Sequence, residues 1–450
     1  MNGAVGLPLD LPELAFEASG GSSIRRTVLP SGVRILSERM PGAQSATVGF
    51  WVAVGSRDEQ PESAGSTHFL EHLLFKGTGG RSALDIAVAF DEVGGEHNAL
   101  TAKEHTCYYA KVRDGDLEMA VRVLADMFTS STLDPDEFEQ ERGVILEELA
   151  MAEDDPGDVA GERFFEAVFG AHPLGRPIGG SPASIAAVDR DSVWAHYRAQ
   201  YGPRDLVVTV AGSVDHGALV AWVEDALTRA GWDLGIEAAP VARRAPRAEP
   251  FAGAGRRAIV RRPLEQVALI LGVEGLAAGD ERRSELAVLN SVLGGGMSSR
   301  LFQEIRERRG LAYSVYSFAA GYSDTGIMAL SAGCSPQRAE EVAQLMVDEW
   351  RRLAESGITE EELRRARGQL GGAAALALED SDTRMSRLGR SELALGEFLD
   401  LDESLRRLHE VGAGQVRALA AELLARPRSI AAVGALDDDA LAALDDDVAA

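Results

Sequence analysis

The sequence predicts an α+β protein of two homologous α/β-sandwich halves, each an antiparallel-rich sheet covered by helices. A chain of 450 residues with 45% hydrophobic content is long enough to bury two or three cores. The same series of strand-like and helix-like patterns occurs twice along it. Residues 235–256 are rich in Ala, Pro, Gly and Arg, lack apolar periodicity, and separate the two series as a linker. We therefore expect a first domain over 24–234 and a second over 257–437.

The predicted elements follow a similar order in both halves. In the first half, β-rich runs alternate with segments of helical periodicity, at 45–56, 66–75, 104–112 and 116–128. In the second half, we expect a strand, a helix, two strands and a helix, at 265–275, 282–295, 311–321, 325–334 and 339–350. Each half closes on a similar phrase, "YGPRDLVVTVAGSVD" and "ARPRSIAAVGALDDD". A duplicated α+β unit explains this repetition most economically.

Net charge and cysteine content limit the classes of binding partner and of cellular compartment that fit the chain. The formal net charge of −26 argues against nucleic acid, whose phosphates need a basic surface, and favours neutral or basic partners. The first residues lack the basic and apolar pattern of an export signal, and no apolar run reaches about 18 residues, so we expect no membrane span. Cys107 and Cys334 lie too far apart to form a metal-binding pair, which favours a reduced, cytoplasmic setting.

The stretch "STHFLEHLLFKGT", residues 66–78, carries the first chemical signal. In a helix with Ser66 or Thr67 as N-cap, His68 and His72 lie one turn apart on the same face, about 5–6 Å between Cβ atoms. Two imidazoles at this spacing suit one zinc ion. Glu71 cannot easily join them as a ligand from the same helix, but it can reach a water beside the metal as a general base.

The alternative is an ordinary amphipathic helix whose histidines are incidental. Its core face would then consist of Phe69, Leu70, Leu73 and Leu74. Because the chain has 8 histidines in 450 residues, the pattern HxxEH is rare by chance, and we favour the metal site. A catalytic zinc site also needs a third protein ligand.

Candidates for the third ligand lie on an acidic helix predicted over 134–156. Pro135 suits its first turn and Pro156 limits its end. Glu141 and Glu148, seven residues apart, lie at the edge of a buried stripe formed by Phe138, Ile145, Leu149 and Ala152. Acidic helices are usually solvated, so the residues alone leave the role of Glu148 open.

The HxxEH motif followed about 75 residues later by "ERGVILEEL" resembles the pitrilysin or insulinase superfamily of zinc metallopeptidases. The resemblance extends from about residue 25 to about 435 and is nearest in pattern to the mitochondrial processing peptidase β subunit and to bacterial peptidases of similar length. It implies that His68, His72 and Glu148 bind one Zn²⁺ per chain. It also implies that Glu71 is the general base and that Glu141 supports the site. Glu147 is the neighbour most easily confused with the ligand.

The resemblance extends to "VGGEHNALTAKEHTCYYA", residues 93–110. It implies that Asn98 and Ala99 lie on a strand edge that binds the substrate backbone. The residues alone would favour Asn98 as a turn residue after two glycines. His97 and His105 are rival metal ligands, but no carboxylate lies at helical spacing from them, and we interpret them as structural or substrate-side residues.

The second half repeats the fold without the metal motif, because its helix "ELAVLNSVLGGG" has no histidine. The resemblance implies that Arg306 and Tyr313 reach across a cleft and steady the scissile carbonyl. The alternative is an interfacial arginine and a core tyrosine. Gly294–Gly296, with Met297, resemble a substrate-engaging loop of noncatalytic subunits of the family. The run lacks the GK[ST] ending of a phosphate-binding loop.

Together these features imply a zinc-dependent endopeptidase acting on short or unfolded peptides, with a preference for basic ones. The resemblance implies a homodimer whose halves close as a clam-like chamber. One alternative is a catalytic subunit that needs an inactive partner in a heterodimer. A second alternative is a nonenzymatic scaffold or peptide-binding homologue with an eroded zinc motif. The chain keeps every matched residue, which favours the enzyme.

Overall fold

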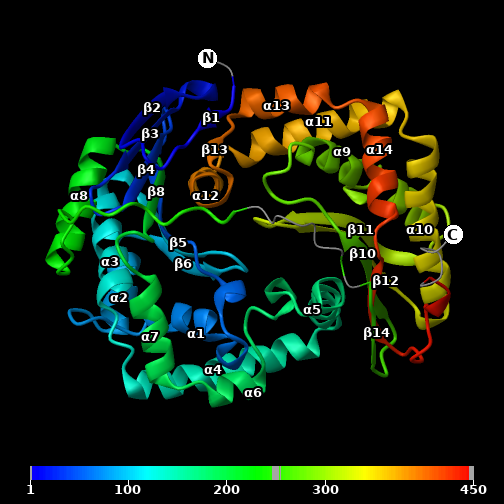
Figure 1. Ribbon diagram of the computed structural model, residues 1–450, viewed down its shortest axis with the longest axis horizontal. Helices are drawn as coiled ribbons and strands as arrows, with labels where there is room; N and C mark the ends of the chain where they lie inside the picture. Colours follow the sequence, from blue (N-terminus) through cyan, green and yellow to red (C-terminus); the bar gives the residue numbers. More distant parts are fainter. Residues whose placement is uncertain (1–2, 246–252, 254, 445–450) are drawn as a thin grey trace. The chain divides into compact units, whose positions relative to one another are not determined.

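The computed structural model describes residues 3–245, 253 and 255–444 of the chain (Figure 1). The backbone divides into two compact units, each assembled from several segments. Unit 1 consists of Met1–Leu149, Pro177–Arg243 and Ala375–Glu403. Unit 2 consists of Ala150–Arg176, Arg244–Ala374 and Ser404–Ala450.

Unit 1 is built on a seven-stranded sheet. In spatial order its strands are β2 (Glu13–Glu17), β3 (Ser23–Val28), β4 (Arg34–Arg39), β8 (Val207–Gly212), β5 (Ser45–Val52), β7 (Thr106–Arg113) and β6 (Glu96–Thr101). Neighbouring strands are antiparallel except β4 and β8, which are parallel. Strand β6 therefore forms one edge of the sheet. A short pair, β1 (Val5–Gly6) with β13 (Glu397–Phe398), completes the strands of the unit.

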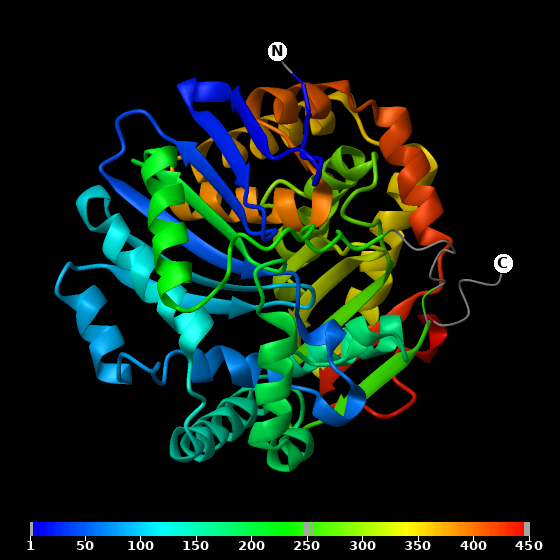
Figure 2. The ribbon, with the colours of Figure 1, turned by 60° about the vertical axis from the view of Figure 1, so that its left-hand side comes forward.

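Helices cover both faces of this sheet. On one face, α3 (Leu117–Ser130) and α8 (His216–Arg229) pack on alternate strand residues such as Val48 and Val210. On the other face, α12 (Ser381–Arg390) packs its Met385 on Trp51 and its neighbours. Both layers can be followed in Figures 1 and 2. The remaining helices that begin in unit 1 are α1 (Ser66–Leu74), α2 (Ala83–Asp91), α4 (Pro135–Asp154), α6 (Pro182–Ala187), α7 (Arg190–Gln200) and α13 (Leu401–Glu410).

Unit 2 repeats the central arrangement with a five-stranded sheet. Its strands, in spatial order, are β9 (Arg257–Arg261), β14 (Ser429–Gly434), β10 (Val267–Glu274), β12 (Gly326–Cys334) and β11 (Ala312–Gly321). The first pair is parallel and the others are antiparallel, as in β4–β8–β5–β7–β6 of unit 1. Its helices are α5 (Pro156–Phe169), α9 (Arg283–Gly294), α10 (Ala339–Ser356), α11 (Glu360–Ala377) and α14 (Ala413–Leu424). The predicted duplicated α+β fold is confirmed.

The compact units differ from the predicted domains at two segments. Residues 150–176, expected in the first domain, belong to unit 2, where Phe164 and Phe169 of α5 pack on Ile270 of β10. Residues 375–403, expected in the second domain, belong to unit 1 because α12 buries its apolar face there. A local apolar pattern shows that a helix has a buried face, but it does not show which sheet that face covers.

The predicted linker is only partly described. Residues 235–245 contain no helix or strand, as expected from their composition. Residues 246–252 and 254 lie outside the described residues. Unit 1 ends at Arg243 in this part of the chain, and unit 2 resumes at Arg244.

A buried ion cluster holds the 375–403 segment on the sheet of unit 1. The carboxylate of Glu392 is fully buried and lies 3.3 Å from Arg26 Nη1, 3.3 Å from Arg243 Nη2 and 3.7 Å from Arg34 Nη1. Burial lowers the pKa of Arg34 to about 10. Glu392 therefore supplies much of the negative charge that offsets the cost of burying these guanidinium groups, because unpaired buried charges are costly.

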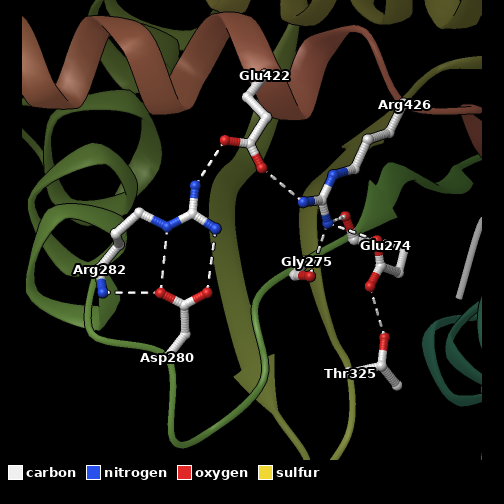
Figure 3. Close-up of polar contacts among 7 residues, drawn as sticks. All are labelled: Glu274, Gly275, Asp280, Arg282, Thr325, Glu422 and Arg426. Atoms are coloured by element: carbon white, nitrogen blue, oxygen red, sulfur yellow. Dashed lines mark hydrogen bonds and ion pairs between the residues drawn. The ribbon is translucent and has the colours of Figure 1, made fainter. Parts of the chain in front are cut away.

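In unit 2, an alternating series of charges fixes the connection from β10 to α9 (Figure 3). Arg426 donates to the carboxylate of Glu274 at the end of β10 and to Oε1 of Glu422 at 2.8 Å. Glu422 Oε2 accepts from Arg282 at 2.6 Å, and Arg282 forms a two-point contact with Asp280. The loop before α9 is therefore fixed to α14 by paired charge-assisted hydrogen bonds.

Both cysteines are buried free thiols, Cys107 in β7 and Cys334 in β12. Burial raises the pKa of the Cys334 thiol to about 11, so the thiol stays protonated at neutral pH. Among the described helices, none is both long and apolar enough to cross a membrane.

Candidate metal centre

Helix α1 carries the histidine motif and starts with an unusual cap. It runs from Ser66 to Leu74, and its N-cap residue is Gly65, whose backbone is left-handed with φ +95°. The expectation that Ser66 or Thr67 would cap the helix is therefore wrong. A left-handed residue strongly favours glycine, and an added Cβ at Gly65 would come within 2.7 Å of the Gly179 carbonyl oxygen. The chain can thus turn sharply into the helix just before the motif.

Helix α1 places its apolar residues on one face and the polar residues of the HxxEH motif on the other. The buried side consists of Phe69, Leu70, Leu73 and Leu74, which join the core of unit 1. His68, Glu71 and His72 are half-buried on the remaining side. Packing of the apolar face therefore fixes the direction in which the three polar side chains point.

Helix α4 carries the acidic residues opposite α1. It begins at Pro135, as expected, and ends at Asp154, while Pro156 opens the next helix, α5. Phe138, Glu141 and Ile145 are buried, whereas Leu149 and Ala152, predicted for the same stripe, are only half-buried. The stripe therefore weakens toward the C-terminal end, where Glu147 and Glu148 are exposed.

Three side chains from α1 and α4 converge at one point. His68 Nε2 lies 3.3 Å from His72 Nε2, and Glu148 Oε2 lies 3.5 Å from His72 Nε2 and 3.8 Å from His68 Nε2. A tetrahedral zinc ion with ligands at about 2.0–2.2 Å separates them by about 3.3–3.6 Å. Within the described part of the chain, these three form the group of His, Cys, Asp or Glu side chains close enough to hold a metal. The donor set fits Zn²⁺.

The orientation of His72 is fixed from behind by Glu141. Its Nδ1–H donates to Glu141 Oε2 at 2.9 Å, because a carboxylate only accepts, and Nε2 therefore faces His68 and Glu148 with its lone pair. Glu141 is 5% exposed, and its other oxygen pairs with Lys76 Nζ at 2.6 Å. A carboxylate behind a ligating histidine is the usual outer support of a metal site.

His68 is held as a neutral imidazole. Burial, with a smaller contribution from His72, lowers its pKa to about 4. Its Nδ1 is buried and has no hydrogen-bond partner among the described residues. A neutral ring with its Nε2 beside a second imidazole and a carboxylate is suited to binding a cation, since metal ligands must be deprotonated.

Glu71 lies beside the candidate ligands, and its carboxylate accepts a hydrogen bond from a residue of the edge strand β6. The hydroxyl of Thr101, the last residue of β6, donates to Glu71 Oε2. Burial raises the pKa of Glu71, while the Thr101 hydrogen bond opposes that rise. A raised pKa brings a carboxylate nearer to neutral pH, where a general base is most effective.

The rival histidines lie in other surroundings. His97 stacks on Phe90 with ring centroids 4.4 Å apart, and His105 lies against Trp51 at 5.5 Å. Their rings therefore have aromatic packing partners, in agreement with a structural interpretation. Asn98 lies within β6 and not in a turn, so the alternative favoured by the residues alone is wrong. Asn98 and its neighbour Ala99 lie on the edge strand of the sheet, where a further strand can pair.

Arg306 and Tyr313 lie together in unit 2. Arg306 belongs to a π-helical turn, Phe302–Glu307, and its Nη1 donates to the Tyr313 carbonyl at 2.8 Å. Its guanidinium lies 4.7 Å from the centre of the Tyr313 ring. Tyr313, on the edge strand β11, is 81% exposed, which excludes the core tyrosine of the alternative interpretation.

The glycine run of the second half has a packing role. Gly294 is the last residue of α9, and a Cβ there would lie 2.3 Å from the Ser317 amide nitrogen. Gly296 faces Gln369 at a similarly short distance. Close approach of α9 to β11 therefore accounts for Gly294, and the side chain of Gln369 in α11 lies against Gly296, while Met297 beside them is 75% exposed.

Two contacts at the site could not be predicted from a motif or a periodic spacing in the sequence. Thr101 meets Glu71 across 30 residues of chain. Glu59 accepts hydrogen bonds from the amides of Gly65 and Thr67 at the start of α1. The sequence feature that could have indicated Glu59 is an acidic residue in the loop before a helix whose cap position is a glycine, which has no side chain to accept hydrogen bonds.

The fold and the site define a class: α+β proteins of duplicated units with a metal-binding cluster in the first copy. The family model described as Insulinase (Peptidase family M16) matches residues 34–181, and that described as Peptidase M16 inactive domain matches 187–370. An uncharacterized zinc protease of Streptomyces coelicolor is 49% identical over 96% of this chain and 94% of its own length. A second, from Bacillus subtilis, is 39% identical over 91% and 98%. The chain belongs to the insulinase family, peptidase family M16.

Solved structures share the fold at low identity. A protease from Helicobacter pylori has a TM-score of 0.83 and 21% identity, covering 93% of this chain and all of its own. A peptidase M16 inactive domain from Pseudomonas fluorescens has a TM-score of 0.80 and 20% identity, covering 94% and 98%. At this identity the likeness describes the fold alone.

Proposed function

We propose that this chain is a zinc-dependent endopeptidase. His68, His72 and Glu148 hold one Zn²⁺, and the observation that supports this most strongly is the convergence of their three ligand atoms within 4.8 Å. The family of the chain and the names of its relatives, printed as zinc proteases, agree with that choice of metal and activity. Bound Zn²⁺ supplies a Lewis acid with an open coordination position for water and substrate.

Glu71 acts as the general base. Its carboxylate takes a proton from the attacking water and passes it to the leaving amine when the peptide bond breaks. The Thr101 hydroxyl fixes the orientation of that carboxylate through the bond to Oε2. Glu141 keeps the Nδ1 proton on His72, so that Nε2 stays available as a ligand.

The peptide substrate binds as an added strand along β6. This strand is the free edge of the unit 1 sheet, and its last residue contacts Glu71. Main-chain pairing at Asn98 and Ala99 then brings the scissile bond to the base without requiring a particular side chain. The net charge of −26 favours basic peptides.

Arg306 and Tyr313 stabilise the carbonyl oxygen as it gains negative charge. The exposed phenol and the guanidinium packed against its ring provide the two donors that this role requires. We expect a homodimer that encloses short or unfolded peptides, which light scattering with and without peptide would test.

The function is tested by two measurements on the same preparation. Zinc is quantified per chain, and cleavage of a quenched peptide library is followed before and after treatment with a chelator. The proposal predicts one zinc per chain and cleavage that stops on chelation and returns when Zn²⁺ is restored. Stoichiometric zinc without cleavage would favour a scaffold or a catalytic subunit that lacks its partner.

A further inference from the structure

The helix that carries both histidines has no cap from its own side chains. Its N-cap, Gly65, has no side chain, and Ser66 Oγ is buried with no hydrogen-bond partner among the described residues. The first amide N–H groups of a helix need acceptors from outside it. Glu59 supplies them, because Oε2 accepts from Gly65 N–H at 2.8 Å and Oε1 from Thr67 N–H at 2.6 Å.

Glu59 is well placed to hold the first turn of α1. It is buried, and a negative charge at the N-terminus of a helix is stabilised by the helix dipole. Its two oxygens bind amides on both sides of Ser66, and His68 follows in the same turn. Two hydrogen bonds donated by backbone amides to one buried carboxylate fix both the position and the rotation of that turn.

The loop that carries Glu59 is itself fixed. The amide of Ser56 donates to the carbonyl of Ala102 at 3.2 Å, and that of Arg57 donates to the carbonyl of Lys103 at 2.9 Å. Residues 102 and 103 directly follow the edge strand β6. The loop that carries Glu59 is therefore tied to the turn after β6, and Glu59 links that loop to the first turn of α1.

The corresponding helix of unit 2 is capped in another way. Before α9, which lacks histidines, Asp280 accepts from the single amide of Arg282 at 2.8 Å, and its oxygens otherwise bind the guanidinium of the same residue (Figure 3). Of these two equivalent helices, the one with two amides bound by a buried carboxylate is the one that carries the metal motif.

We propose that Glu59 is a positioning residue for the metal centre, which sets the direction of His68 by capping α1 from the preceding loop. This inference rests on the proposed function, because it assumes that His68 and His72 bind zinc. Replacing Glu59 by Gln keeps one acceptor and turns an amide N–H₂ group toward the other donor. We expect the first turn to shift and zinc affinity to fall about tenfold, the lower end for supporting residues of a metal site.

The test compares wild type with Glu59→Gln and the matched control Glu62→Gln. Glu62 is an exposed residue three positions away in the same loop. Zinc dissociation constants are measured by competition with a chromophoric chelator, and the absorption spectrum of the Co²⁺-substituted protein reports ligand geometry. Hydrogen exchange of the first amides of α1 is measured on the metal-free protein, so that one readout is independent of both metal and activity.

We expect Glu59→Gln to show weaker zinc binding, an altered Co²⁺ spectrum and faster exchange, while Glu62→Gln matches wild type. Unchanged affinity, spectrum and exchange in Glu59→Gln would overturn the inference. If Glu59→Gln does not fold, Glu59→Asp decides by the same readouts, since its shorter carboxylate reaches one amide and should give an intermediate loss. If wild type itself binds no zinc, the proposed function fails, and the exchange data still test the cap.

Discussion

Replacing Glu141 by Gln should weaken zinc binding more than it weakens the fold. Glu141 receives two charge-assisted hydrogen bonds, from His72 Nδ1 at 2.9 Å and from Lys76 Nζ at 2.6 Å. A glutamine of the same shape offers a single acceptor oxygen, so one donor meets an N–H₂ group. Loss of such outer support costs about 10–100-fold in metal affinity, or about 1.4–2.8 kcal/mol of binding free energy. Lys76 is partly exposed, so water can solvate its charge and stability changes little.

The assay is a competition titration of zinc, followed by peptide cleavage at saturating zinc. Glu147→Gln is the matched control, because Glu147 is an exposed glutamate of the same helix, next to the proposed ligand. We expect Glu147→Gln to bind zinc as wild type does. A Glu141→Gln variant with wild-type zinc affinity would refute the argument that Glu141 fixes His72 for the metal.

Three further outcomes follow from the structure. Glu392→Gln should destabilise the protein by about 3–5 kcal/mol in urea unfolding, because the buried Arg26 and Arg34 and the partly buried Arg243 lose their counter-charge, and a loss below about 1 kcal/mol would contradict this. Tyr313→Phe should lower kcat by about 10²–10³-fold with KM nearly unchanged, whereas the control Tyr316→Phe on the same strand should behave as wild type. A Tyr313→Phe variant with the kcat of wild type would exclude a role of Tyr313 in stabilising the carbonyl oxygen. Burial lowers the pKa of His216 to about 4, so the unfolded chain takes up the proton first as pH falls below about 6.5. The difference in unfolding free energy between wild type and His216→Gln should therefore shrink as pH falls from about 6.5 to 4, by at most about 1.4 kcal/mol per pH unit. A difference that stays constant across that window would contradict the predicted direction of the pH dependence.

The duplicated fold could be predicted because its signals are local and occur twice. Alternating and helical apolar patterns identify strands and helices within short windows, and β5, β7, β10 and β12 lie where such runs predict them. The assignment of α5 and α12 to units could not be predicted in this way. Their apolar faces are evident from sequence, but the sheet that each covers depends on tertiary packing.

In the candidate site too, local spacing predicts some contacts, while others depend on tertiary packing. His68 and His72 come from one helix, so a spacing of four residues already predicts their proximity. Glu148 comes from another helix, and the residues alone left its role open until the family resemblance suggested it. Thr101 and Glu59 reach the site through contacts between separate elements, for which no periodicity exists. The cap at Gly65 was missed because hydroxyl side chains are the usual N-caps, whereas here the cap comes from the preceding loop.

In the proposed mechanism, zinc held by His68, His72 and Glu148 and the carboxylate of Glu71 act together in peptide hydrolysis. The most direct test of this mechanism is a comparison of wild type and Glu71→Gln for both zinc content and the rate of peptide cleavage. We expect one zinc per chain in both proteins and a loss of cleavage of at least about 10²-fold in the variant, since Gln cannot accept the proton. A Glu71→Gln protein that retains zinc and cleaves at the wild-type rate would contradict the mechanism.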